Sequence, residues 1–297
     1  MSPSGRTIVI TGATGLLGRA CCRYFSARGW EVRAIVRRPD AARDLEPYAT
    51  GGIYRGELPG NLDKRAFIGA PAAVVHSAYA TEGRDLKRAA AINLDGTRAV
   101  RALASAHAAG RFVFVSSIAA TPDAESFYAR SKRQIEATLD TDRDLALRPG
   151  FIIGRGGLFA RLCDAIRARP LVPLLYGGRQ EIQTVWLEDV CRAIERALER
   201  ELTGVLHVAH PDAVPIRRFY EAIASLVDRR CRFVRLPAGP LLVALRGAER
   251  LGVVLPISSE NVLGLKHLRA VEVEPDLERL GLEPRSFAAA LALLPDG

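Results

Sequence analysis

Lysine is scarce in this sequence of 297 residues. Only four of its 42 basic residues are lysine, so the formal net charge of +9 rests almost wholly on arginine. The arginines are spread along the chain, which a codon preference explains most simply, although a basic surface also attracts anionic ligands and membranes. Because no compact basic run with interleaved aromatic residues is present, we expect no nucleic-acid partner.

Ordered cysteine patterns are also missing. None of the five cysteines forms a CxxC pair or joins a Cys/His cluster with metal-ligand spacing; they are Cys21, Cys22, Cys163, Cys191 and Cys231. We therefore expect no metal site, and we expect the adjacent Cys21 and Cys22 to be buried thiols in a helix. An odd count without pattern is typical of a reducing compartment, which predicts a cytoplasmic protein.

Long uninterrupted apolar runs are absent as well. The most apolar late stretch, 236–257, contains Arg246, Glu249 and Arg250, so it is too interrupted to span a bilayer. A strand pattern starts within a few residues of Met1, which argues against a signal peptide. We expect a chain without a membrane span, although association with a membrane surface or a protein complex stays open, as does the oligomeric state.

Short β-branched runs alternate with helical patterns in the first half of the chain. Buried strands are predicted at 6–11, 31–36, 72–76, 112–116 and 145–147, and helices between them, such as 17–28 and 85–109. This alternation predicts an α/β fold, a doubly wound Rossmann sheet that is parallel and covered on both faces. We place the Rossmann domain at 1–154 and a smaller C-terminal substrate lobe at 155–297, with about 184–200 packing back on the first domain.

A glycine-rich turn joins the first strand to the first helix. It reads Thr11-Gly-Ala-Thr-Gly-Leu-Leu-Gly18. Gly12 allows the tight turn, Gly15 lets a pyrophosphate approach the backbone, and Gly18 permits close packing of helix on strand. The free N–H groups of the helix N-terminus favour phosphate. We expect a dinucleotide to be held here by Gly12, Thr14, Gly15, Leu16, Leu17 and Gly18.

Two arginines follow the second strand, where folds that prefer NAD carry an acidic residue for the ribose hydroxyls. Arg37 is the first candidate to bind the extra phosphate of NADP(H), with Arg38 or Arg19 as helpers. Solvent-exposed surface arginines are the alternative. Glu57, after the third strand, could accept a hydrogen bond from the adenine amino group. These residues predict NADP(H) in preference to NAD(H).

Tyr128 and Lys132 are spaced to lie on one face of a helix. A tyrosine phenol has an ordinary pKa near 10, and a fixed neighbouring cation favours its ionised form, so Lys132 is expected to lower the pKa of Tyr128. Ser117, just past a strand end, could hydrogen-bond a substrate carbonyl. Such a set suits hydride transfer to or from a nicotinamide.

These motifs together resemble the short-chain dehydrogenase/reductase superfamily, in its extended and atypical branches. The matching segments are TGATGLLG at 11–18, HSA at 76–78, NLDGT at 93–97, VSS at 115–117, YARSK at 128–132 and LRPGFIIG at 147–154. Softer matches continue through 177–190 and 280–284, so the resemblance covers nearly the whole chain. It is similar to bacterial relatives of the NADPH-binding accessory subunit of complex I, which are described as NAD-dependent epimerase/dehydratase-like.

The resemblance implies roles for individual residues. Tyr128 would be the general acid/base, Lys132 would bond the nicotinamide ribose, and Ser117 would polarise the carbonyl. It extends the expected cofactor site to Leu58, Ser77, Ala78, Pro149, Phe151 and Ile152, the backbone near the last two seating the carboxamide. Asn93 resembles the helix asparagine that supports the active site, with plain helix structure as an equal alternative.

Two departures argue against a sugar-nucleotide substrate. Ile118-Ala-Ala-Thr121 stands where nucleotide-sugar enzymes usually have a Tyr-Gly, and Gln183 stands where they commonly have an arginine.

We expect an oxidoreductase or epimerase-like enzyme acting on the carbonyl or hydroxyl of a small organic molecule. The alternative is a non-catalytic NADPH-binding assembly factor, redox sensor or accessory protein. Candidate pocket residues are Tyr79, Phe151, Phe159, Tyr176 and Gln183.

Overall fold

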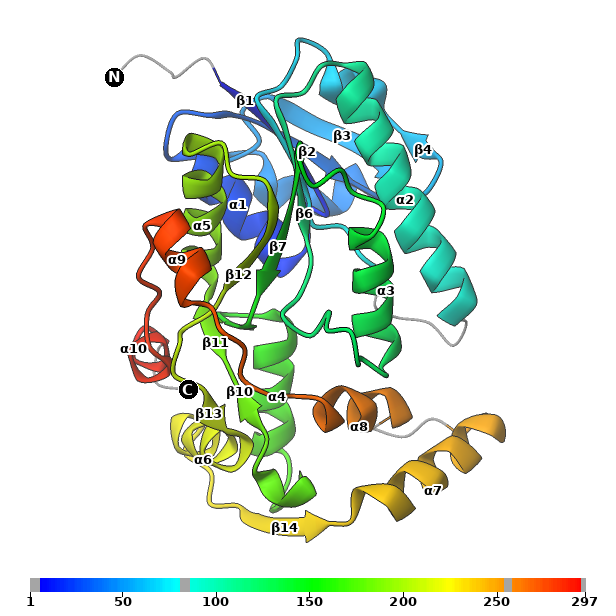
Figure 1. Cartoon of the computed structure of the whole chain (residues 1–297), viewed down its shortest axis with the longest axis vertical. Helices are drawn as coiled ribbons and strands as arrows, with labels where there is room; N and C mark the ends of the chain where they lie inside the picture. The colour runs from blue at the N-terminus through cyan, green and yellow to red at the C-terminus, as the bar shows by residue number, and fades with distance from the viewer. Residues whose placement is uncertain (1–5, 81–85, 254–257, 295–297) are drawn as a thin grey trace.

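An eight-stranded sheet forms the centre of the computed structural model, which describes residues 6–80, 86–253 and 258–294 (Figure 1). Its strands are β1 (Thr7–Thr11), β2 (Glu31–Val36), β3 (Gly52–Glu57), β4 (Asn61–Leu62), β5 (Ala73–His76), β6 (Arg111–Val115), β7 (Asp144–Pro149) and β12 (Gly204–Val208). The spatial order is β12-β7-β6-β5-β1-β2-β3-β4, and all neighbours are parallel except the β3–β4 pair. The chain winds outward from β1 in both directions, so the doubly wound α/β fold is confirmed.

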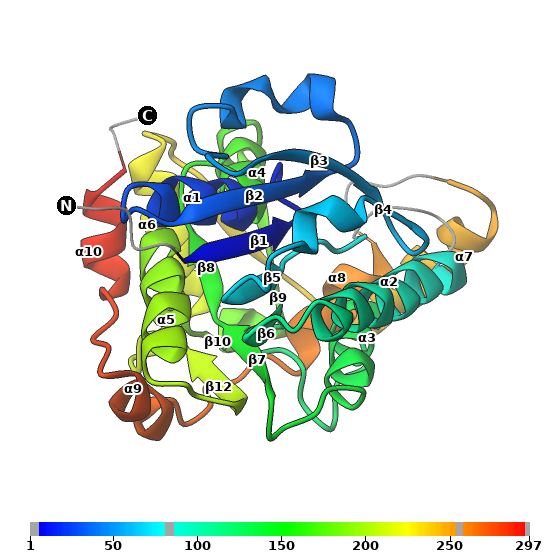
Figure 2. The ribbon, with the colours of Figure 1, turned by 90° about the horizontal axis from the view of Figure 1, so that it is seen from above.

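Alternate residues along each strand point to opposite faces of the sheet, and both faces are covered. On one face Ile8 and Ile10 pack with residues of α1 (Leu16–Ser26), α5 (Leu187–Glu199) and α9 (Glu274–Leu280). On the other, Val9 and Phe114 pack with α2 (Leu86–Ala106) and α3 (Phe127–Glu136). Figure 2 shows α1 and α5 on one side of the strands and α2 and α3 on the other.

The outer helix α5 is joined to α1 by both sulfur and oxygen contacts. The thiols of Cys21 and Cys191 lie 3.7 Å apart, and the Tyr24 hydroxyl donates to Glu195 at 2.6 Å. Burial raises the pKa of Cys22 to about 12, so this thiol stays protonated at neutral pH. Cys21 and Cys22 are buried free thiols, as the sequence predicts.

Most of the remaining elements build a second apolar core around Phe159, Ile166, Phe219 and Ile223, and α7 packs beside it against Leu175 and Val262. The remaining elements are β8 (Phe151–Ile153), α4 (Gly157–Arg167), β9 (Leu171–Leu175), β10 (Glu181–Ile182), β11 (Thr184–Trp186), β13 (Val214–Pro215), α6 (Ile216–Leu226), β14 (Arg232–Leu236), α7 (Ala238–Arg250), α8 (Ser259–Lys266) and α10 (Phe287–Ala292). Short 3-10 turns lie at Pro39–Leu45, Lys64–Phe67 and Tyr176–Gly178.

The expected strands and helices lie where the sequence places them, within one or two residues at most ends. The exception is helix α2, which ends at Ala106, three residues before the expected end. Asp85, the expected start of that helix, and 254–257 of the late apolar stretch lie outside the described residues. The division of the chain at residue 154 stays a prediction.

The described part of the chain has neither a membrane-spanning helix nor a cluster of metal-ligating side chains. None of its helices combines the length and the apolar character that a membrane-spanning segment needs. Within the same residues, no three side chains of His, Cys, Asp or Glu are grouped to hold a metal ion.

Candidate functional site

The glycine-rich turn after β1 is shaped by close backbone contacts. Gly12 has a φ of +66°, and a Cβ there would lie 2.6 Å from the backbone nitrogen of Ala78. A Cβ on Gly18 would lie 2.2 Å from the Gly12 carbonyl oxygen. Gly15 differs, because its Cβ would meet nothing closer than that same oxygen at 3.2 Å. Gly12 and Gly18 therefore serve the fold, whereas Gly15 borders open space.

The first turn of α1 presents backbone N–H groups without a competing side chain. Gly15 is its N-cap, no side chain caps it, and its first turn holds no acidic residue. Thr14 and Gly15 are exposed, Leu16 is half-buried and Leu17 is buried. Together with the positive end of the helix dipole, this leaves a site for an anion.

The arginines after β2 differ in their pairing. Arg37 and Arg38 are exposed, and neither has an ion-pair partner within residues 6–80, 86–253 and 258–294. Arg19, the other predicted helper, pairs with Asp44 and donates to the Thr14 carbonyl at 2.9 Å. Arg37 and Arg38 are therefore available to an incoming phosphate, whereas Arg19 is already engaged.

Glu57 is the last residue of β3 and does not follow it, because that strand extends to pair with β4. Its side chain is exposed. Leu58 packs against α2, where a Cβ on Gly96 would lie 2.9 Å from the Leu58 Cβ. Ser77 donates to the Thr11 carbonyl at 2.7 Å, which holds the end of β5 against the glycine turn.

A chain of hydrogen bonds ties β1, β5 and α2 together beneath the site. His76 bonds the hydroxyls of Thr11, at 2.7 Å, and Thr97, at 3.1 Å. Asn93 accepts from the Ala80 N–H at 2.7 Å and donates to its carbonyl at 3.2 Å. Burial, with a smaller effect from Lys132, lowers the pKa of His76 to about 3, so it stays neutral. His76 is a satisfied core histidine, and Asn93 fixes the loop after β5.

Ser117, Tyr128 and Lys132 meet at the carboxyl edge of the sheet. Ser117 follows β6, and Tyr128 and Lys132 lie one turn apart on α3, whose N-cap Ser126 accepts from the Ala129 N–H at 3.3 Å. Tyr128 is 39% exposed, so its ring is open to a ligand, while Lys132 is buried.

The Lys132 ammonium lies among aromatic rings. Its Nζ donates to the Val115 carbonyl at 2.6 Å and lies 4.1 Å from the ring centre of Tyr79, 4.7 Å from that of Phe114 and 5.8 Å from that of Tyr128. Such cation–π contacts partly replace lost hydration. The rings of Tyr79 and Tyr128 meet edge to face at 5.4 Å, so Tyr79 supports both groups.

The pKa values of Lys132 and Tyr128 differ from the prediction. Burial lowers the pKa of Lys132 to about 7, against a smaller opposite effect of Glu136. Burial raises the pKa of Tyr128, and the Ser117 hydroxyl lowers it only in part. The expectation that Lys132 lowers the pKa of Tyr128 is therefore wrong for this arrangement, because the ammonium is turned toward Val115 and desolvation dominates.

The Tyr79 hydroxyl is buried and has no hydrogen-bond partner among the described residues. Burial raises its pKa to about 12, although the nearby Ser131 and Asn93 side chains act in the opposite direction. An unpartnered buried hydroxyl is costly, so a ligand that supplied a partner would gain free energy.

The other candidate pocket residues do not join this group. Phe151 and Phe159 pack in the second core, and Tyr176 packs beside α7. Gln183 is buried and brackets the Val271 backbone, donating to its carbonyl at 3.0 Å and accepting from its N–H at 2.9 Å. Gln183 thus anchors the chain before α9.

The LRPGFIIG segment lies next to Ser117 and crosses from the main sheet to the second core. The Pro149 carbonyl accepts from the Ile118 N–H at 3.0 Å. Phe151 N–H donates to the Gln183 carbonyl at 2.8 Å, and Ile152 pairs with Val185 in the β8–β11 ladder.

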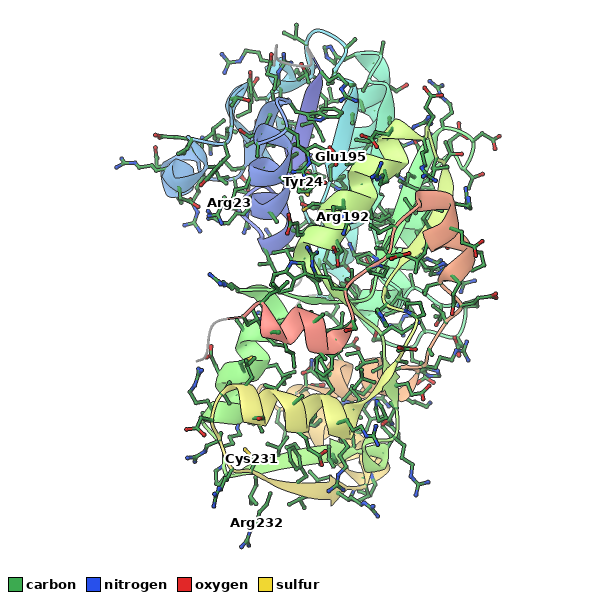
Figure 3. All side chains as sticks on the ribbon, turned by 90° about the vertical axis from the view of Figure 1, so that its left-hand side faces the viewer. Arg23, Tyr24, Arg192, Glu195, Cys231 and Arg232 are labelled. Atoms are coloured by element: carbon green, nitrogen blue, oxygen red, sulfur yellow. The ribbon has the colours of Figure 1, made fainter. Side chains whose placement is uncertain are left out.

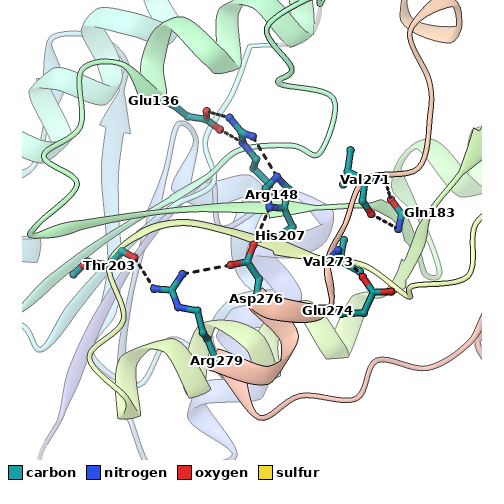
Figure 4. A network of polar contacts seen from close by, with 10 residues as sticks. All are labelled: Glu136, Arg148, Gln183, Thr203, His207, Val271, Val273, Glu274, Asp276 and Arg279. Atoms are coloured by element: carbon teal, nitrogen blue, oxygen red, sulfur yellow. Dashed lines mark hydrogen bonds and ion pairs between the residues drawn. The ribbon is translucent and has the colours of Figure 1, made fainter.

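A polar network that the sequence analysis missed begins one turn beyond Lys132 (Figure 4). Arg148 donates to Glu136 through Nε at 2.9 Å and Nη2 at 2.5 Å, and its Nη1 lies 3.2 Å from His207 Nε2. His207 Nδ1 lies 2.8 Å from Asp276, which pairs with Arg279 at 3.3 Å. The network links α3, β7, β12 and α9. The i,i+4 spacing of Lys132 and Glu136 is the one sequence signal that could have pointed to it.

Helix α8 and His267, which follows it, hold the start of α3, the helix that carries Tyr128. Lys266 pairs with Glu125 at 2.5 Å, His267 lies 2.8 Å from the same carboxylate, and the Phe127 N–H donates to Glu260. Next to these contacts a crevice runs between the two segments. It is lined mainly by apolar residues, among them Ile118, Ala119, Ala129, Leu263 and Leu268.

Known proteins are similar to this chain in both sequence and fold. The model of the NAD dependent epimerase/dehydratase family matches residues 8–209, more than half of the chain. The chain belongs to this family. The predicted resemblance to the epimerase/dehydratase branch of the short-chain dehydrogenase/reductases is thereby confirmed.

Two curated members of the family are similar along most of their length. Ceramide reductase of Caulobacter vibrioides is 31% identical over 255 residues, which cover 82% of this chain and 78% of that protein. A 2-alkyl-3-oxoalkanoate reductase of Stenotrophomonas maltophilia is 28% identical over 309 residues, which cover 92% and 87%. This similarity places the chain among NAD(P)-dependent reductases and epimerases.

Two solved structures with the same fold carry different cofactors. The human epimerase family protein SDR39U1 with NADPH has a TM-score of 0.69 and 20% identity, covering 96% of this chain and 97% of that one. WbmG of Bordetella bronchiseptica in complex with NAD has a TM-score of 0.73 and 20% identity, covering 97% and 92%. At this identity the likeness shows the fold, so the choice between the two cofactors depends on this chain's own residues.

Proposed function

We propose that this protein is an NADP(H)-dependent reductase that converts a ketone on an alkyl chain to the secondary alcohol. The observation that carries the proposal is the meeting of Ser117, Tyr128 and Lys132 beside the glycine-rich turn at the carboxyl edge of a parallel sheet. Ligands of doubly wound folds bind at that edge, where the strand order reverses.

The residues present fit a dinucleotide phosphate. The uncapped start of α1 and the open space beside Gly15 suit the pyrophosphate, and the unpaired Arg37 and Arg38 suit a ribose 2′-phosphate. Glu57 would bond the adenine amino group. Leu58, Ser77 and Ala78 would line the adenosine half, and Pro149, Phe151 and Ile152 the nicotinamide half.

In this proposal each polar residue has one task. The bound nicotinamide supplies a hydride for the carbonyl carbon. Tyr128 gives its phenolic proton to the carbonyl oxygen, and Ser117 donates a hydrogen bond to that oxygen. A raised pKa suits Tyr128 to this direction, because the phenol is then fully protonated at neutral pH. Lys132 bonds the ribose, and its amine supplies a positive charge to the site when it is protonated.

The alkyl chain is proposed from the crevice that is lined by Ile118 and Ala129, the chain neighbours of Ser117 and Tyr128. Its apolar lining includes Ile118, Ala129, Leu263 and Leu268, with His267 and Arg269 also lining it. The names of the two curated relatives support this, because a ceramide and a 2-alkyl-3-oxoalkanoate both carry long hydrocarbon chains.

The test is a series of straight-chain methyl ketones of rising length, with NADPH oxidation followed by absorbance. Each methylene that the crevice buries should contribute about 0.8 kcal/mol, so kcat/KM should rise about fourfold per carbon until the crevice is filled. Leu263→Ser should flatten the dependence on length, with Leu158→Ser, at an exposed leucine of α4, as control. Absence of NADPH oxidation with every ketone tested, and of NADP+ reduction with every corresponding alcohol, would favour the non-catalytic alternative.

A further inference from the structure

An apolar and cationic surface lies at the far end of the second core from the large sheet. It consists of exposed side chains of β9, β14 and α7 and of residues next to these elements, and we call it the distal patch; its members are Leu171, Val234, Leu236, Val243, Leu251, Arg230, Arg232, Arg246 and Arg250. Figure 1 shows β14 and α7 at the lower limit of the molecule. In Figure 3 the Arg232 side chain points away from the body of the protein.

The two-stranded sheet of β9 and β14 has one face that is open to solvent over most of its length; α7 covers it only at Leu175. The register pairs Leu171 with Arg232, Pro173 with Val234 and Leu175 with Leu236, so these side chains share one face. On the opposite face Val172 and Leu174 enter the second core. Leu171 is 53% exposed, which is unusual for a leucine in a strand.

Helix α7 continues this surface directly after β14. Its inner side is fixed by Ala238 and Leu245, which pack with Leu175 and Val262. Its outer side exposes Val243, at 72%, and Leu251 follows the helix at 83%. Large apolar side chains gathered in this way on a surface mark an interaction site.

The same surface carries mostly positive charge. The segment 228–253 holds six arginines and only two acidic residues, Asp228 and Glu249. Glu249 is engaged with Ser259, accepting from its N–H and its hydroxyl at 2.7 Å each. None of the six arginines has an ion-pair partner within the described ranges. Arg230 and Arg232 also line a shallow hollow with Pro170, Leu171 and Cys231.

We propose that the distal patch docks the protein on the surface of an anionic lipid bilayer. Apolar side chains would enter the boundary between headgroups and acyl chains, and the arginines would meet lipid phosphates. The complementarity of charge is the argument for lipid, because unpaired guanidinium groups surround the exposed leucines and valines. The proposal is independent of the reaction, since no residue of the patch belongs to the candidate active site.

The experiment is flotation of the full-length protein with vesicles of phosphatidylcholine, with and without a one-third share of phosphatidylglycerol. Binding is expected on the phosphatidylglycerol vesicles alone, and it should weaken as the salt rises from about 0.1 M to about 1 M, because salt screens the attraction. Arg232→Ala, next to Leu171 on the outer face, should lower the partition coefficient about fivefold, the usual effect of one basic residue near such a surface. Arg143→Ala, at an exposed arginine before β7, should leave it unchanged.

The apolar part of the patch has its own pair of variants. Leu251→Ser should weaken vesicle binding, whereas Ile68→Ser, at another exposed position next to the large sheet, should not. NADPH binding should be the same in all four variants, which separates this test from the proposed function. Equal flotation on both kinds of vesicle, or a dimer in light scattering that Leu251→Ser dissociates, would overturn the proposal.

Discussion

Arg148 holds both carboxylate oxygens of Glu136 with two hydrogen bonds, of 2.9 and 2.5 Å, one helical turn from Lys132. Both side chains are largely buried. Glu136 raises the pKa of Lys132 against the larger effect of burial. The pair therefore stabilises the fold and helps to keep a cation in the site.

Replacement of Glu136 should affect both roles. Glu136→Gln should lower the free energy of unfolding by about 3 kcal/mol, because it leaves Arg148 without its counter-charge. It should also lower the pKa of Lys132 below about 7, so the pH above which NADPH affinity declines should move down. Denaturant unfolding and NADPH titration from acid to neutral pH measure the two effects. Arg148→Lys is the control, since it keeps the positive charge beside Glu136. If the pH dependence of NADPH affinity were unchanged in Glu136→Gln, Glu136 would have no role in the site.

Titration of Lys132 predicts a pH dependence of stability. Its pKa is about 7 when folded and about 10.4 when unfolded, so the unfolded chain binds more protons between these values. Stability should consequently rise with pH across this window, and the rise should be absent in Lys132→Met. Thermal unfolding at pH 7 and pH 9 tests this, and His76 does not interfere because its pKa, about 3, lies far below. If stability changed with pH in the same way in the unmodified protein and in Lys132→Met, the low pKa of Lys132 would be contradicted.

The phenol of Tyr128 should be needed for turnover and not for binding. Tyr128→Phe keeps the ring packed against Tyr79 but removes the proton donor, so turnover should fall by roughly a hundredfold or more. NADPH affinity should stay within a factor of two or so. Tyr176→Phe is the matched control, because that tyrosine packs beside α7 and not with Ser117 and Lys132. Undiminished reduction by Tyr128→Phe would remove it from the mechanism.

Gly15 and Gly18 should respond differently to a side chain. Gly15→Val should fold and fail to bind NADPH, because its side chain would occupy the open space beside the turn. Gly18→Ala should destabilise the protein itself, since its Cβ would lie 2.2 Å from the Gly12 carbonyl oxygen. Circular dichroism and NADPH fluorescence of both variants separate the two effects. Normal binding by a folded Gly15→Val protein would place the phosphate elsewhere.

Arg37 should set the preference for NADPH over NADH. Charge-assisted hydrogen bonds to the 2′-phosphate contribute roughly 1.5–3 kcal/mol, which is about ten- to a hundredfold in affinity. Arg37→Ala should weaken NADPH binding by that factor and leave NADH binding nearly unchanged. Arg143→Ala serves as control. Equal affinities of the unmodified protein for the two cofactors would disprove the assignment.

Local patterns in the sequence predict most of the sheet and the glycine turn, because both depend on neighbours a few residues apart. The contacts that complete the site come from distant segments and have no local signature. Gln183 reads as a ligand residue and in fact brackets Val271. The buried Asp189 of α5 accepts from the Arg285 backbone N–H at 2.8 Å, across 96 residues of the chain. The pKa of Tyr128 was predicted in the wrong direction because desolvation depends on packing that spacing does not reveal.

The packing of α1 against α5 has a consequence for synthesis of the chain. Cys21 and Tyr24 are made early, but Cys191 and Glu195, which cover them, leave the ribosome about 170 residues later. At roughly 5–20 residues per second this delay lasts on the order of ten seconds or more. The nascent nucleotide-binding half therefore exposes the outer face of its first helix throughout that interval, as a surface that chaperones can bind. A chain that ends before residue 187 never covers it.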